Sequence, residues 1–125
     1  MLEEEQVPNM SASRPLRNEE IELITAMVSE SPKGNQLVGT LSERLVEDMK
    51  DGGMGSLRFS NAERRIRKFG KKIAEAEFND EDGILVSATI NVDDAGTLFE
   101  LDIWKVDFSP LKRYPKFGDI RRIPI

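Results

Sequence analysis

Three stretches of alternating apolar and polar residues, separated by short acidic turns that contain glycine, constrain the fold of this chain most strongly. The alternation covers 74–78, 84–92 and 99–104. A period of two is typical of strands that bury one face, and turns of this composition favour hairpins between such strands. The sequence therefore predicts an antiparallel meander at 73–107.

The register of this meander follows from the requirement that the apolar side chains share one face. Pairing Phe78 with Ile84, and Val92 with Thr97, meets this requirement in both hairpins and places Phe99 in the core. A slip by one residue would turn a whole apolar row to the other face, so it is disfavoured. Several alanines on the core face leave room for a helix to lie against it.

The N-terminal half predicts that helix and two more strands. Residues 19–30 have an acidic first turn and an apolar stripe at helical spacing. A short helix is expected at 36–42 and a strand at 44–49, with helix at 44–49 as the alternative, because residues 40–43 fit a capping box and Leu41, Leu45 and Met49 repeat at helical spacing. The glycine-rich turn at 51–55 then enters a strand near 56–59. The predicted fold is α+β, an antiparallel sheet of about five strands packed on one face by the N-terminal helix.

The chain of 125 residues has the size of one domain with a modest core. We expect residues 1–13 to form a flexible tail, because they are polar and show no period. Residues 14–125 are then a single domain. The proline-containing segment 110–125 could fold back over the polar face of the sheet.

The absence of both cysteine and histidine narrows the chemistry that the chain can perform. Disulfides, thiolate zinc sites and cysteine nucleophiles are excluded, and the usual general base and metal ligand is missing. The sequence contains no cofactor or metal signature. The acidic N-terminus does not resemble a signal peptide, and no apolar stretch reaches the roughly 18 residues of a membrane span. A cytoplasmic protein is expected.

The polar face of the predicted sheet carries the candidate binding residues. These are Glu75, Glu77, Glu100, Asp102 and Trp104. Acidic groups around an aromatic anchor favour docking of a basic protein, because complementary charge accelerates association and tryptophan is frequent at interface hot spots. An immunity-like inhibitor of a basic toxin is one form of this hypothesis. The tryptophan could instead pack beneath a chain terminus.

Two other functions stay open from the sequence. A small enzyme would combine Glu75 or Glu77 with Lys105 or Asp107 as acid and base, in a concave pocket that holds at least two of these groups. Nucleic-acid binding would use the basic run at 64–72, although the net charge of −5 disfavours long-range attraction to phosphate. We therefore favour a non-enzymatic interaction domain.

Three segments resemble a family of short bacterial proteins of uncharacterised function. They read RPL at 14–16, DGGMGSL at 51–57 and LFELDIWKVDFSPL at 98–111. The resemblance extends over roughly residues 14–112 and implies a stand-alone bacterial domain. It implies no activity, ligand or catalytic residue.

Overall fold

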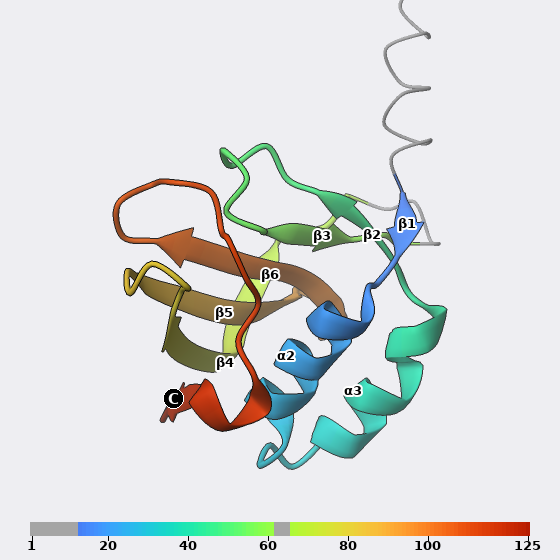
Figure 1. Ribbon diagram of the computed structural model, residues 1–125. Coiled ribbons are helices and arrows are strands. Elements are labelled where there is room, and N and C mark those ends of the chain that lie inside the picture. The colour runs from blue at the N-terminus through green and yellow to red at the C-terminus, as the bar shows by residue number, and fades with distance from the viewer. Residues whose placement is uncertain (1–12, 62–65) are drawn as a thin grey trace, which may run out of the picture.

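The computed structural model describes residues 13–61 and 66–125, which form one seven-stranded antiparallel sheet and two α-helices (Figure 1). The helices are α2 (Asn18–Val28) and α3 (Gly34–Thr40), and two short 3₁₀ turns are η1 (Leu41–Glu43) and η2 (Phe117–Asp119). The strands are β1 (Arg14–Pro15), β2 (Leu45–Asp48), β3 (Leu57–Phe59), β4 (Phe69–Asn79), β5 (Leu85–Asp93), β6 (Leu98–Lys105) and β7 (Arg121–Ile123). Their order in the sheet is β1-β2-β3-β6-β5-β4-β7.

The α+β class is confirmed, but the sheet is larger than the predicted five strands. The two additional strands, β1 and β7, contain two and three residues and lie at opposite edges of the sheet. Segments this short show no alternation of their own, so their pairing depends on contacts that the local sequence does not contain.

The central meander is β4–β5–β6, with an offset of two residues from the predicted register. Phe78 pairs with Val86 rather than with Ile84. The cause is a tighter turn, in which the Asp80 amide donates to the Ile84 carbonyl at 2.9 Å and Gly83 has a φ of 84°. This leaves a three-residue loop with glycine in the left-handed region. Because the offset is even, the same side chains still face the core.

In the second hairpin, the register differs from the predicted one because of a tight turn and a β-bulge at Phe99. The pairing between β5 and β6 shifts by one residue there, so Leu98 joins the main hydrophobic cluster and Phe99 does not. Phe99 is buried in a different way. Its ring lies beneath the guanidinium groups of Arg58 and Arg67, at 4.6 and 4.9 Å from the centroid.

Helix α2 lies against one face of the sheet, with α3 beside it (Figure 1). It buries Leu23, Ile24 and Met27 in the shared core. The helix ends at Val28, two residues before the predicted end, and Pro32 has no N–H to continue the bond to the Val28 carbonyl. The predicted helix at 19–30 is therefore present but shorter.

The ambiguous segment after this helix is a short helix followed by a strand. Helix α3 and β2 correspond to the predicted helix at 36–42 and strand at 44–49, and the alternative of a helix at 44–49 is wrong. The glycine-rich turn connects β2 to β3, as the sequence predicts.

The C-terminal segment crosses the helix side of the molecule and ends as β7 on the edge of β4 (Figure 1). Leu111, Tyr114 and Ile120 from this segment pack against the core. It therefore does not cover the opposite face of the sheet. We call that opposite face the open face, because both helices and the C-terminal segment lie on the other side.

Candidate functional site

The open face carries all five residues that the sequence singles out. Cross-strand pairing places most of them in two adjoining rows: Glu75, Thr89 and Asp102 form one row, and Glu77, Ser87 and Trp104 form the next. The two register offsets cancel between β4 and β6. The predicted pairings of Phe78 with Ile84 and of Val92 with Thr97 therefore also place Glu75 in line with Asp102 and Glu77 in line with Trp104, and only the residue from the middle strand differs.

Three of the four candidate carboxylates that the sequence placed on this face have a cationic partner beside them. The pairs are Lys72 with Glu75 at 2.8 Å, Arg121 with Glu77 at 3.6 Å, and Arg58 with Glu100 at 2.5 Å. The strongly acidic surface that the sequence predicts is thus largely neutralised. Sequence reasoning missed this because Arg58 comes from β3, whose pairing with β6 was not predicted, and Arg121 comes from β7, which was not predicted as a strand.

Asp102 is the remaining carboxylate, with no ion pair to any residue in the described ranges. Partial burial raises its pKa above the ordinary value, and the negative charges of Glu100 and Asp51 raise it further. A hydrogen bond from Ser56 Oγ at 3.4 Å opposes these effects. A cation supplied from outside would stabilise the ionised form of this carboxyl group.

One end of the open face is apolar and solvent-exposed. Trp104 is 47% exposed and Phe108 is 68% exposed, and their rings lie 5.9 Å apart in a tilted arrangement. Val106 is also exposed, and its amide donates to the Leu85 carbonyl at 3.0 Å, which places Leu85 next to it. We call these four residues the aromatic end. Exposed apolar side chains that form a contiguous patch, unlike single scattered ones, often mark interaction sites.

The backbone at Phe108 is strained. Its φ of 65° makes it the one non-glycine residue with a positive φ among those described. The turn is held by the Phe108 amide, which donates to the Lys105 carbonyl at 2.8 Å, and by Asp107, which accepts bonds from Ser109. A bulky residue in this conformation costs about 1–3 kcal/mol, and such strain is often found at functional sites.

Lys105 does not take part in the open face. Its ammonium group is fully buried on the helix side, 2.8 Å from Asp80 Oδ2 and 2.7 Å from Asp82 Oδ2, and it also donates to the Pro110 carbonyl at 3.3 Å. Glu75 and Glu77 lie on the opposite face. The structure therefore does not bring Lys105 together with Glu75 or Glu77, which is one of the acid–base pairs that the enzyme hypothesis requires.

Asp80 joins this buried pair to the C-terminal segment. Its carboxylate accepts the Lys112 amide at 2.8 Å and the Arg113 amide at 3.0 Å. Burial alone would raise the pKa of Asp80, but the bonds from Lys105 and from the Lys112 amide hold it below its ordinary value. We call Asp80, Lys105 and these two amides the tail clamp. Sequence reasoning did not identify Asp80 and Asp82 as the partners of Lys105, because these acids come from a turn more than 20 residues upstream.

Two described basic residues of the run at 64–72 make contacts within the protein. Arg67 is almost fully buried, where it stacks on Phe99 and lies 3.4 Å from Asp93. Lys72 pairs with Glu75, as above. Residues 64 and 65 lie outside the described ranges. Of the described basic residues in this run, Lys68 and Lys71 are therefore the exposed ones without a role in these internal contacts.

The three segments RPL, DGGMGSL and LFELDIWKVDFSPL bond to one another or to the elements beside them. The Leu111 amide donates to the Gly53 carbonyl at 3.0 Å, and Ser56 Oγ accepts the Ile103 amide at 2.8 Å. Gly53 needs its glycine, because φ is 83° and a Cβ would lie 3.2 Å from Pro110. The contacts of these residues stabilise the fold, and they do not indicate a shared binding or catalytic site.

Arg14, from the first of these segments, anchors the helix start to β2. Its guanidinium donates to both oxygens of Glu20 at 2.9 and 2.8 Å and to both oxygens of Asp48 at 3.1 and 2.8 Å. Glu20 is fully buried, and it also accepts the Arg17 amide at 2.8 Å. Its acidic position in the first turn was visible in the sequence, whereas its arginine partner was not.

In the described part of the chain, no cluster of three or more acidic residues is placed to hold a metal ion. No helix there is long and apolar enough to cross a membrane.

A family model described as a domain of unknown function (DUF6984) matches residues 13–115. No curated protein and no solved structure matches the chain. The matched range contains β1 to β6 and the whole aromatic end, and it stops before η2 and β7.

Proposed function

The chain belongs to the DUF6984 family, and we propose that it is a non-enzymatic protein-binding domain that docks its partner on the aromatic end of the open face. The observation that supports this proposal is the exposed pair of Trp104 and Phe108, with Phe108 held in a strained conformation. An apolar group kept in water at the expense of backbone strain gains its compensation when a partner covers it.

The proposed partner presents a lysine or arginine beside an aliphatic or aromatic side chain. Asp102 lies two residues from Trp104 on β6 and has no cation among the described residues, so a partner cation would satisfy it. The apolar contact then supplies most of the affinity, and the carboxylate supplies orientation. This differs from a broad acidic surface, because Glu75, Glu77 and Glu100 already have partners.

An immunity-like inhibitor of a basic protein is one concrete form of this proposal. A bacterial origin and a cytoplasmic location, both expected from the sequence, would be consistent with it.

The test uses a random peptide library displayed on phage and selected against the wild-type chain. We expect enriched peptides with basic residues next to large apolar ones. Their affinity should fall at least about tenfold, or 1.4 kcal/mol, for the double variant Trp104→Ala, Phe108→Ala.

Phe69→Ala is the matched control, since Phe69 is 59% exposed but lies outside the aromatic end. It should retain full affinity. If the double variant binds the selected peptides as tightly as the wild type, or loses no more than the Phe69 control, the proposal is wrong.

A further inference from the structure

A groove lies on a different side of the molecule, where the α2–α3 turn faces the start of β4. It has a volume of about 490 Å³. Leu37, Ile73 and Val92 line it with apolar surface, and Lys33, Lys71 and Lys72 contribute its charged groups. The volume is within the range of small-molecule sites, which combine apolar walls with a few polar groups.

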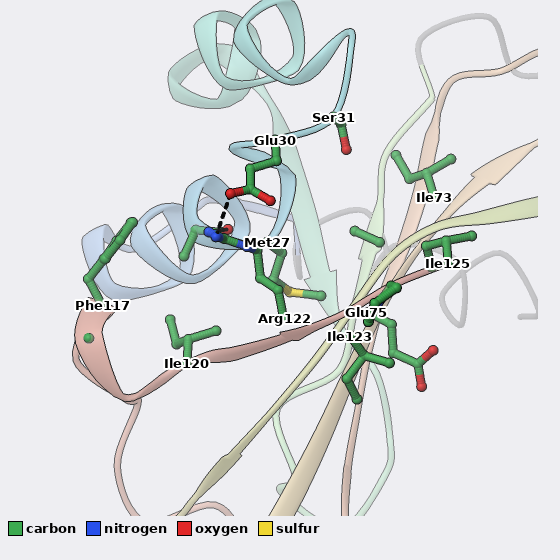
Figure 2. Close-up of a pocket in the computed structure, with 14 residues that line it drawn as sticks. Met27, Glu30, Ser31, Ile73, Glu75, Phe117, Ile120, Arg122, Ile123 and Ile125 are labelled. Carbon is green, nitrogen blue, oxygen red and sulfur yellow. Dashed lines mark hydrogen bonds and ion pairs between the residues drawn. The ribbon is translucent and has the colours of Figure 1, made fainter.

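The groove adjoins a second hollow of about 600 Å³, with which it shares Ser31, Ile73 and Ile125. Figure 2 shows Ile73 and Ile125 at one end of this hollow and Phe117 and Ile120 at the other. The apolar wall therefore continues beyond the lysines.

Arg122 is the cation of the second hollow, and its guanidinium is already engaged. It pairs with Glu30 at 2.9 Å (Figure 2). It also bonds to Ser29 Oγ at 2.8 Å and lies 3.4 Å from the Ala26 carbonyl at the end of α2. The hollow is also lined by Glu30 and Glu75, so its apolar surface from Ile73, Ile120 and Ile125 is interrupted by acidic groups, and it has no free cation of its own among the described residues.

Uncompensated positive charge is concentrated at the first groove. Lys33 and Lys71 are exposed, and neither has an ion pair with a residue that the structure describes. Lys72 is paired with Glu75, and no acidic side chain lines the groove. On a chain with a net charge of −5, this local excess of cations indicates an anionic ligand.

The backbone beside the groove disfavours an added peptide strand. The pairing of β4 with β5 is irregular between Phe69 and Lys71 and again between Lys72 and Ala74. Bulges and lysines at a sheet edge are typical devices that prevent strand addition. A flexible apolar chain with one anionic head fits this surface better than an acidic peptide.

We infer that this groove binds a medium-chain fatty acid, with its carboxylate between Lys33 and Lys71 and its alkyl chain along Leu37 and Ile73 toward the second hollow. The site is independent of the aromatic end, so the two proposals succeed or fail separately. Several residues of the second hollow lie beyond the range that the family model matches.

Isothermal titration of the full chain with octanoate, decanoate and dodecanoate, each below its micellar concentration, tests this inference. We expect saturable binding of one molecule that tightens about fourfold for each added methylene until the groove is filled. Decanol, which lacks the charge, should bind at least about tenfold more weakly than decanoate.

Two double variants separate the groove from the total charge. Lys33→Ala with Lys71→Ala should reduce decanoate affinity to the level of decanol, whereas Lys50→Ala with Lys116→Ala removes the same charge elsewhere and should leave affinity unchanged. The inference is overturned if decanoate shows no saturable binding, if both double variants weaken it equally, or if hexaglutamate binds as tightly as decanoate. Circular dichroism verifies that each variant is folded.

Discussion

Phe108 is the residue at which local conformation and proposed function oppose each other. A positive φ of 65° disfavours phenylalanine, and glycine would adopt it without strain. We expect Phe108→Gly to raise the free energy of unfolding by about 1 kcal/mol. The same change should weaken binding of the selected peptides, because it removes half of the aromatic pair.

Chemical denaturation measures the stability part of this prediction. Phe117→Gly is the matched control, since Phe117 is 58% exposed and has no positive φ. It should not stabilise the chain. Equal effects of the two substitutions would show that Phe108 is not strained.

The raised pKa of Asp102 predicts how the stability of the chain depends on pH. Its folded-state pKa is raised by partial burial and by Glu100, so ionisation at neutral pH opposes folding. Asp102→Asn should therefore be more stable than the wild type at pH 7. The difference should disappear as the pH falls below the ordinary value of 3.8, where the carboxyl group is protonated in both states.

The pKa of Asp48 is shifted in the opposite direction to that of Asp102, so the two substitutions should have opposite effects on stability. Bonds from Arg14 lower the pKa of Asp48, so its contribution to stability is present at neutral pH and is lost as the pH falls through the lowered pKa. Asp48→Asn should be less stable than the wild type at pH 7 and equal to it in strong acid. Urea denaturation at a series of pH values measures the free energy of unfolding of both variants and of the wild type. If both substitutions change the stability at pH 7 in the same direction, the assignment is contradicted.

At the scale of elements, the tail clamp determines where the C-terminal segment lies. Asp80 is the acceptor for Lys105 and for the amides of Lys112 and Arg113. Asp80→Asn should accelerate hydrogen exchange at these two amides and lower stability at neutral pH. Because the folded pKa of Asp80 is lowered, the deficit relative to wild type should vanish as the pH falls through that pKa.

Asp119→Asn is the control for the clamp, because Asp119 is exposed and belongs to η2. It should leave exchange at both amides unchanged. Protection of the Lys112 and Arg113 amides that survives in Asp80→Asn would show that other contacts hold the segment.

The glycine-rich turn allows a comparison of two neighbouring positions. Gly52 and Gly53 have φ values of 77° and 83°, but a Cβ at Gly52 meets open space and one at Gly53 lies 3.2 Å from Pro110. Alanine at either position should cost about 1 kcal/mol for the backbone alone. Gly53→Ala should cost more than Gly52→Ala, because Pro110 must also move, and thermal unfolding ranks the two.

At the scale of the whole molecule, the sequence predicted the elements with their own periodicity and missed those that depend on distant partners. The alternating runs predicted β4 to β6 and the residues of each strand that face the core. Burying one face of a strand determines whether its odd-numbered or its even-numbered residues point inward. The register was offset by two because tight turns and the bulge at Phe99 leave no trace in the alternation.

The candidate site was predicted only in part, for the same reason. The positions of Asp102 and Trp104 on one face follow from alternation along β6. The neutralisation of Glu77 depends on Arg121, which arrives from a three-residue strand at the far end of the chain. The turn that exposes Phe108 beside Trp104 likewise has no periodic signal.

The central claim is that the aromatic end is the surface by which this domain binds its partner. Backbone and indole NMR spectra, recorded while the chain is titrated with a peptide selected from the library, test it most directly. We predict shift changes centred on Trp104, Val106 and Phe108, with the amides of α2 and α3 unaffected. Changes centred on the helix side, with the Trp104 indole resonance unmoved, would contradict the claim.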